Sequence, residues 1–207
     1  LFKWKFKKIY NKKCHKRNKE KSMKLLLKLF FLFILINFTN INAKENIMIL
    51  KLKTGDVKIE LFPDVAPNHV SRIKELANSG KYDNVVFHRV IDGFMAQTGD
   101  VQFGNSADSN FNLQSAGMGG SNLPDLKAEF NNLPHERGTL SMARSSDPNS
   151  ANSQFFICFD AAPHLDRQYT VFGKVIDGMD NIDKITKGDG PNGSVSNPDK
   201  IISFRSE

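Results

Sequence analysis

The sequence predicts a mainly β protein, folded as a closed barrel of short strands and capped by two α-helices. Short apolar runs recur with the period-two alternation that is typical of strands. Two segments far apart in the chain instead show apolar residues at helical spacing. The 164 residues that follow position 43 are enough for one domain with a single sizeable core.

The first element is a hairpin over Ile47–Phe62. Apolar and polar residues alternate after Ile49, which predicts strands with one face in the core and one in water. The turn between the two strands is expected at Thr54-Gly55-Asp56, where glycine accommodates the reversal.

Two helices are predicted from residue spacing and from their stop signals. Pro67 suits the first turn of the first helix, and Gly80 ends it. Its apolar face comprises Val70, Ile73, Leu76 and Ala77. The second helix ends at Gly188, and its apolar face comprises Met179, Ile182 and Ile185.

The remaining chain alternates between strands and polar connections. The further strands are expected at Val85–Met95, Gly138–Ala143, Ser153–Phe159, Tyr169–Val175 and Ile201–Phe204. Residues 101–125 form a long polar loop, and a loop of that length within a domain is usually functional or mobile. Arg144–Asn152 is a second polar loop, and Ala161–Arg167 a short turn or helical piece.

Residues 23–43 have the order of a secretory signal peptide. Met23-Lys24 opens a basic start, Leu25–Ile36 is apolar except for Lys28, and Ala43 is a small residue suited to cleavage. The apolar run has 12 positions, whereas a membrane-spanning helix needs about 20. We therefore expect an exported, periplasmic domain over residues 44–207 that has no stable membrane span once the signal is cleaved. The alternative is a domain tethered by an uncleaved segment.

Residues 1–22 carry ten Lys or Arg and one acid, Glu20. Such a basic segment can bind nucleic acid or anionic lipid. Because it precedes a complete signal, we interpret it as sequence upstream of the true start at Met23. The first 43 residues hold 12 of the 29 basic and one of the 22 acidic side chains, so the rest of the chain has a net charge of −4. The basic balance of the whole chain therefore does not predict a nucleic-acid partner.

The two cysteines, Cys14 and Cys158, predict no disulfide in the exported domain. Cys14 lies in the basic segment, and Cys158 lies alone in an apolar strand. We therefore interpret Cys158 as a small buried hydrophobic residue rather than a nucleophile.

The segment Phe87–Asp100 is the most informative for function. Arg89, Met95 and Gln97 share odd numbering, so in an extended strand they fall on one face, although Gly93 can interrupt that register. An apolar floor beside a fixed cationic donor suits a neutral, partly apolar substrate. The segment offers no pair of nucleophile and base.

Four blocks of sequence carry a resemblance to a known family. They are Phe87–Asp100, Gly138–Ala143, Asn152–Ile157 and Phe172–Val175. In order and spacing they resemble the cyclophilins, which are peptidyl-prolyl cis-trans isomerases, over about residues 47–204. The resemblance implies an eight-stranded antiparallel barrel with a helix over each end and an active groove on its outer surface. It implies proline-containing polypeptides as substrates, no cofactor and no metal, and we expect a monomer.

The resemblance also assigns site residues by position. Arg89 matches the catalytic arginine. The positions that match the substrate-binding groove are Phe94, Met95, Phe156 and Leu165 for the proline pocket, Gln97 and Gln154 for the peptide backbone, Ala143 for a main-chain contact, and Gly117 for the glycine-rich loop of the neighbouring subsite.

Three further groove positions depart from the eukaryotic pattern. Arg144 replaces an asparagine, as in bacterial members. His164 stands where a tryptophan is associated with tight cyclosporin binding, so weakened binding of that drug is expected. Tyr169 replaces a pocket histidine, again as in bacterial members, and keeps an aromatic wall.

These residues also allow other interpretations. A proline-recognising chaperone or binding module without turnover is the main alternative, although binding alone does not require Arg89. His88 is interpreted as structural, because a buried histidine usually satisfies backbone partners. His135 and Glu136 lack further ligands at metal-binding spacing. Ser141, Ser153 and His164 lack the nucleophile elbow of a hydrolase.

Overall fold

The computed structural model describes residues 46–207, so the predicted basic segment and signal peptide lie outside the described residues. Within residues 46–207, neither helix has the length and apolar character needed to cross a bilayer.

Eight antiparallel strands form a single sheet, in the order β3-β4-β6-β5-β7-β2-β1-β8. Their bounds are β1 Ile47–Leu52, β2 Gly55–Leu61, β3 Arg89–Ile91, β4 Met95–Thr98, β5 Thr139–Met142, β6 Phe155–Cys158, β7 Val171–Asp177 and β8 Ser203–Ser206. The two end strands are linked through the residues before them, because Val86 and Lys200 form an antiparallel bridge. The prediction of a mainly β fold with eight antiparallel strands is confirmed.

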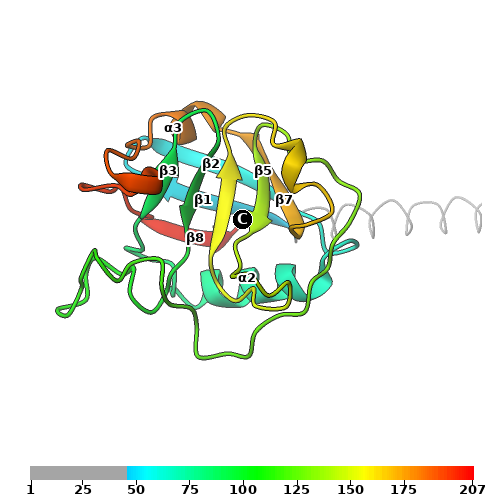
Figure 1. The fold of residues 1–207 in the computed structure, drawn as a ribbon, viewed down its shortest axis with the longest axis horizontal. Coiled ribbons are helices and arrows are strands. Elements are labelled where there is room, and N and C mark those ends of the chain that lie inside the picture. The colour runs from blue at the N-terminus through cyan, green and yellow to red at the C-terminus, as the bar shows by residue number, and fades with distance from the viewer. Residues whose placement is uncertain (1–45) are drawn as a thin grey trace, which may run out of the picture. The chain divides into compact units, whose positions relative to one another are not determined.

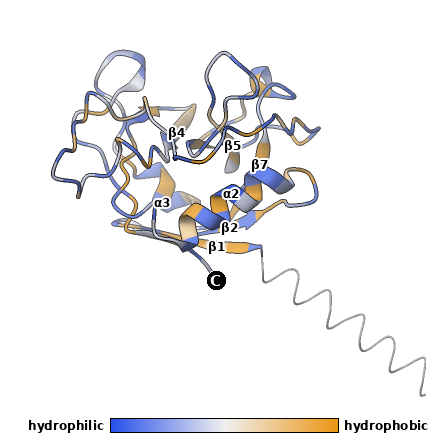
Figure 2. Cartoon of the chain, turned by 90° about the horizontal axis from the view of Figure 1, so that it is seen from below, coloured by the Kyte–Doolittle hydropathy of each residue, from blue (hydrophilic) through white to orange (hydrophobic). Residues whose placement is uncertain are grey.

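In the part of the chain that the structure describes, two α-helices accompany the sheet: α2 over Pro67–Asn78 and α3 over Met179–Asp183. They lie at opposite ends of the curved sheet (Figure 1). Apolar residues of α2 recur on the side that faces the strands, as Figure 2 shows, and Ile73 and Ala77 on that side are fully buried. Short 3-10 turns occupy Pro163–Leu165 and Pro191–Gly193.

Several predicted boundaries were wrong by a few residues, among them the start of β6, which begins at Phe155 rather than at Ser153. The last two strands begin two residues later than expected, at Val171 and Ser203. Ile201 nevertheless contacts the segment before β3, since its N–H bonds to the carbonyl of Val85. Helix α3 ends at Asp183, short of the predicted Gly188, while Ile185 remains buried in the loop that follows.

Alternate residues of each strand fill the barrel interior, where aromatic rings meet. Phe155 packs edge-to-face against both Tyr82 and Phe172, and Phe204 contacts the same group. All four rings are fully buried. Neighbouring residues on the opposite face of the strands form a second, smaller apolar cluster outside the barrel, and this cluster underlies the candidate site.

Candidate functional site

The site is built on the hairpin formed by β3 and β4. Arg89 lies directly opposite Gln97, and Ile91 lies opposite Met95. Gly93, at a φ of 67°, forms the turn between the strands. The single strand-like run that the sequence suggested is therefore a tight hairpin, but cross-strand neighbours share a face, so Arg89 and Gln97 do lie together as expected.

Strand β6 completes the floor of the site. It pairs with β4 so that Phe156 lies opposite Gln97 and Cys158 opposite Met95. Because side chains alternate along a strand, Phe155 enters the barrel core while Phe156 joins the outer apolar cluster. That cluster contains Met95, Phe156, Cys158, Ala162 and Leu165, with Ile91, Phe94, Ala143 and Tyr169 packed against it.

These side chains border a slot of about 300 Å³. Its lining comprises Arg89, Phe94, Met95, Gln97, Ala143, Arg144, Phe156, Leu165 and Tyr169, each of which is a predicted site residue. Phe156 and Tyr169 meet edge-to-face, with ring centroids 6.0 Å apart. The ring of exposed His164 lies 5.5 Å from that of Phe94, at the rim. The slot is thus bounded by aromatic and aliphatic side chains, with a guanidinium at one side.

Arg89 is held by uncharged acceptors. Its Nε donates to the carbonyl of Asn192 over 2.9 Å, and its Nη1 donates to Oε1 of Gln97 over 3.3 Å. The Sδ of Met95 lies 3.9 Å from the same Nη1. Partial burial lowers the pKa of Arg89 from its ordinary value, but an arginine in a protein remains a cation. The site therefore places a permanent charge beside apolar surface.

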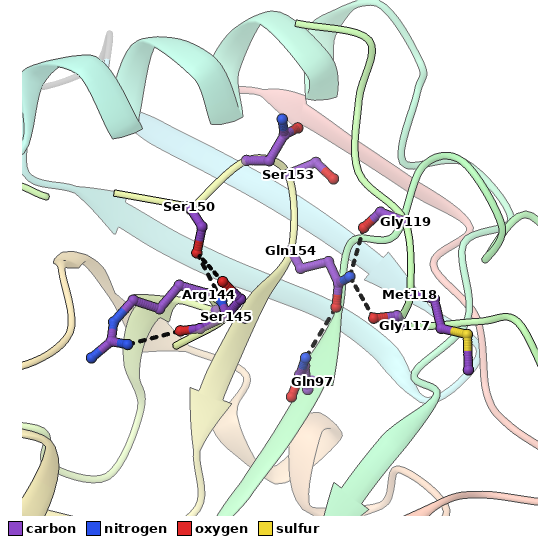
Figure 3. A pocket seen from close by; sticks show the side chains of 11 residues that line it. Gln97, Gly117, Met118, Gly119, Arg144, Ser145, Ser150, Ser153 and Gln154 are labelled. Carbon is purple, nitrogen blue, oxygen red and sulfur yellow. Dashed lines mark hydrogen bonds between the residues drawn. The ribbon is translucent and has the colours of Figure 1, made fainter. Parts of the chain in front are cut away.

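A directed chain of hydrogen bonds that starts at Arg89 continues across the groove, and Figure 3 shows its part from Gln97 to Gly117 and Gly119. Nε2 of Gln97 donates to Oε1 of Gln154 over 3.0 Å. Nε2 of Gln154 then donates to the carbonyls of Gly117 and Gly119, over 2.9 and 2.7 Å. Each amide therefore has a single orientation that satisfies its neighbours.

A second hollow, of about 250 Å³, adjoins the slot. Gln97, Ala143 and Arg144 line both spaces. The rest of the second lining is Gly117, Met118, Gly119, Ser145, Ser150, Asn152, Ser153 and Gln154. The predicted residues Gly117 and Gln154 thus belong to this hollow. Sequence reasoning missed Met118, which is 79% exposed at its edge.

The loop at residues 117–119 is fixed by the buried carboxylate of Asp100. Its Oδ2 accepts from the N–H groups of Gly117 and Gly119, and its Oδ1 accepts from those of Gln102 and Phe103. Gly117 has a φ of 98°, and a Cβ there would lie 2.6 Å from the ring of His88. Only glycine fits that position without displacement.

His88 itself is 8% exposed, and its Nδ1 has no hydrogen-bond partner. Burial lowers its pKa from the ordinary value. Its ring lies against Gly117 of the glycine loop, but the backbone partner expected from the sequence is not found at Nδ1.

A polar array lies beneath the slot. The ring of His135 stacks on Phe156 at a centroid distance of 6.1 Å and an angle of 15°. Its Nδ1 lies 2.9 Å from Oδ1 of Asp166, and its Nε2 lies 3.0 Å from Oγ of Ser141. Burial lowers the pKa of His135. Ser141 is fully buried and bonds to the carbonyl of Thr170, so this array supports the wall and presents no nucleophile.

The sequence signals for these supporting contacts were weak. His135 and Asp166 are 31 residues apart, and Arg89 and Asn192 are 103 apart, so no local pattern joins them. Over residues 46–207 no group of three or more His, Cys, Asp or Glu side chains is arranged to hold a metal ion. Cys158 is buried, which raises the pKa of its thiol to about 12.

Comparisons with known proteins agree on one family. The model of the family described as cyclophilin type peptidyl-prolyl cis-trans isomerase matches residues 47–206. A probable peptidyl-prolyl cis-trans isomerase of Brucella suis is 63% identical over 159 residues, which cover 76% of this chain and 81% of the relative. The Gallus gallus protein named peptidyl-prolyl cis-trans isomerase-like 3 is 42% identical, over 67% of this chain and 80% of its own.

A solved structure is similar in fold as well. The crystal structure of a cyclophilin type peptidyl-prolyl cis-trans isomerase from Cryptosporidium parvum, determined in the presence of the dipeptide Ala-Pro, matches with a TM-score of 0.66 and 29% identity. The match covers 78% of this chain and 98% of that one.

Proposed function

Because this chain belongs to the cyclophilin-type peptidyl-prolyl cis-trans isomerases, we propose that Arg89 is its catalytic residue and that the adjoining slot holds the ring of the substrate proline. The chain is an enzyme that accelerates rotation about X–Pro peptide bonds. The observation that carries the assignment is the position of the Arg89 guanidinium, beside Gln97 and Met95 at the edge of an apolar slot.

The reaction needs no bond to be made or broken. The barrier to rotation, about 18–20 kcal/mol, arises because the nitrogen lone pair delocalises into the carbonyl. Uncatalysed exchange at X–Pro therefore takes tens to hundreds of seconds. Any group that draws the lone pair back onto nitrogen weakens the double-bond character of the C–N bond and lets it rotate.

Arg89 has the chemistry for that task. Its Nε is engaged with Asn192 and its Nη1 with Gln97, and the guanidinium, which has five N–H donors in all, lines the slot. As the C–N bond twists, the prolyl nitrogen becomes pyramidal and accepts a hydrogen bond that the planar ground state does not offer. An interaction made only in the twisted state raises the rate rather than merely tightening binding. Lowering the barrier by about 7 kcal/mol accelerates exchange by roughly 10⁵-fold.

The apolar wall serves the same step. Phe94, Met95, Phe156, Leu165 and Tyr169 grip the pyrrolidine ring, so the chain on the carbonyl side is the part that swings. Their surface excludes water, and a hydrogen bond from a guanidinium is stronger at low dielectric. Gln97 and Gln154 fix the backbone of the bound peptide, and Ala143 lies against it.

The test is an exchange measurement on an Ala-Pro peptide by NMR, without a coupling protease. Arg89→Ala should remove most activity, and Arg89→Lys, which keeps the charge but loses the planar fork, should restore only part of it. Unfolding curves and binding of a proline peptide to each variant are the controls. If Arg89→Ala retains near-normal rates while folded, the catalytic assignment is wrong.

We also propose weak binding of cyclosporin and a monomeric state. His164 is an exposed imidazole at the rim of the slot, and it offers less apolar surface than the tryptophan associated with tight binding of the drug. His164→Trp should therefore tighten cyclosporin binding without loss of turnover. Sedimentation of residues 44–207 tests the monomer.

For localisation, we propose export guided by residues 23–43, with the isomerase domain acting on proteins that fold in the periplasm. The support is the sequence pattern of a basic start, a short apolar core and a small exit residue. The native N-terminus, read by mass spectrometry, distinguishes a cleaved domain beginning near Lys44 from a tethered form.

A further inference from the structure

The charged side chains that line the groove are all positive. Of the residues that line the slot and the adjoining hollow, the charged ones are Arg89 and Arg144, and no carboxylate is among them. The chain from residue 44 onward has by contrast a net charge of −4. A cationic groove on an acidic domain is an arrangement that selects among ligands by charge.

Arg144 lies where the two spaces meet, since it lines both. Its guanidinium carbon lies 4.4 Å from the centroid of the Tyr169 ring, one wall of the slot. In Figure 3 its side chain extends on the far side of the hollow from Gly117 and Gly119. A peptide whose proline fills the slot and whose chain continues into the hollow passes Arg144 within one or two residues, since a residue spans at most about 3.6 Å.

The guanidinium of Arg144 is positioned but not neutralised. Its Nε and Nη2 donate to the carbonyl of Gln168, and its Nη1 donates to the carbonyls of Ser145 and Ser146. These acceptors are all uncharged. The ion pairs found within residues 46–207 include neither Arg144 nor Arg89.

Three acidic residues lie in segments that adjoin the groove, and each contacts a group other than Arg144. Asp147, in the same loop, accepts from the N–H of Asn149. Asp166, next to the slot residue Leu165, accepts from His135. Asp92, in the β3–β4 turn, lies 3.9 Å from the ammonium of Lys187. None of them forms an ion pair with Arg144, so its charge is available to a bound peptide.

We infer that this isomerase prefers X–Pro segments that carry Asp or Glu within two residues of the proline, and that Arg144 is the residue that reads this charge. The inference rests on the proposed function of the slot. Stacking on Tyr169 and three carbonyl contacts hold the guanidinium in one place, so a carboxylate pairs with it at a reduced cost in side-chain entropy.

The expected preference is modest, because Arg144 is still partly exposed. Ion pairs in contact with water change an equilibrium by a factor of about two to five. We therefore expect kcat/KM for a Glu-containing peptide to exceed that for its Lys counterpart by about twofold to fivefold at low salt. The ratio should approach one at about 1 M salt, where the screening length is about 3 Å.

The experiment compares peptides that differ by one residue beside a constant proline: Glu, Gln, Ala or Lys, on the N-terminal side in one series and on the C-terminal side in another. Exchange rates are measured by NMR for the wild type and for Arg144→Gln, Arg144→Glu and Arg144→Lys. Lys51→Gln is the matched control, since it removes one positive charge from an exposed position on β1, remote from the groove lining.

The deciding quantity is the ratio of kcat/KM for the Glu peptide to that for the Lys peptide within each variant. This ratio is independent of any change in the overall rate of the variant. The inference holds if the ratio falls towards one in Arg144→Gln, inverts in Arg144→Glu, and persists in Arg144→Lys and Lys51→Gln. It is overturned if the wild type treats Glu and Lys alike in both series, or if Lys51→Gln lowers the ratio as much as Arg144→Gln. Inactivity of the wild type on the Ala peptide would instead contradict the proposed function itself.

Discussion

Arg89 and Gln97 face each other across the β3–β4 hairpin, with Nη1 of Arg89 3.3 Å from Oε1 of Gln97. The bond holds the guanidinium at the slot, and it leaves the amide nitrogen of Gln97 pointing to Gln154. One glutamine therefore orients both the proposed catalytic group and the polar side of the groove.

Gln97→Ala should accordingly lower kcat more than it raises KM. The guanidinium would keep its charge and its bond to Asn192 but lose its second anchor, and a misplacement of about 1 Å can cost up to a hundredfold in rate. We expect a loss of about tenfold or more, measured by NMR exchange on Ala-Pro peptides. Gln114→Ala, at an exposed position in the long loop, is the control. Equal rates in the two variants would exclude this positioning role.

Phe155 and Phe156 are neighbours in the sequence, but their side chains lie on opposite faces of β6. Phe155 is fully buried in the aromatic core, so Phe155→Ala should cost about 3–5 kcal/mol of unfolding free energy. Phe156 borders the slot, so Phe156→Ala should cost less stability but raise KM for proline peptides strongly.

Urea unfolding and steady-state kinetics on both variants separate the two effects. If Phe156→Ala is the more destabilising variant and leaves KM unchanged, the two rings do not have these separate roles.

Asp100 fixes the glycine loop, because its buried carboxylate accepts four backbone N–H groups. Asp100→Ala leaves those donors without their acceptor, so we expect a loss of about 2–4 kcal/mol of stability. Faster hydrogen exchange at Gly117 and Gly119 should accompany it.

Asp108→Ala is the matched control, since Asp108 accepts from one N–H in an exposed turn. Unchanged exchange at the glycines of Asp100→Ala would contradict the anchoring role.

Stability should fall on mild acidification. Burial is the largest cause that lowers the pKa of His69, His88 and His135 below the usual 6.5. Below about pH 6.5 the unfolded chain therefore binds protons that the folded one resists, so the free energy of unfolding decreases as the pH falls through that range.

The free energy of unfolding should depend less steeply on pH in His135→Gln, which removes one of these histidines. Urea titrations between about pH 7.5 and 5.5 measure it. A flat profile in the wild type would refute the prediction.

Much of this architecture was predictable because it is encoded locally. The hairpin at residues 47–62 and helix α2 follow from alternation, Pro67 and the spacing of apolar residues, all within a few residues of one another. Strand edges were less predictable. The N–H of Ile201 bonds to the carbonyl of Val85, which is remote in the sequence, whereas that of Tyr169 bonds to Leu165 in a local turn. Apolar spacing did not distinguish either residue from the strand that follows it.

By itself, the sequence determined the order of the elements, because side-chain periodicity depends on near neighbours. Its four blocks of resemblance to the cyclophilins assigned the residues of the slot and Arg89 at its edge. Only the tertiary structure decided that the carbonyl of Asn192 orients Arg89, that His135 supports Phe156, and that Arg144 stacks on Tyr169 without a carboxylate partner. Those contacts depend on how the barrel brings distant segments together, and local spacing carries no information about that.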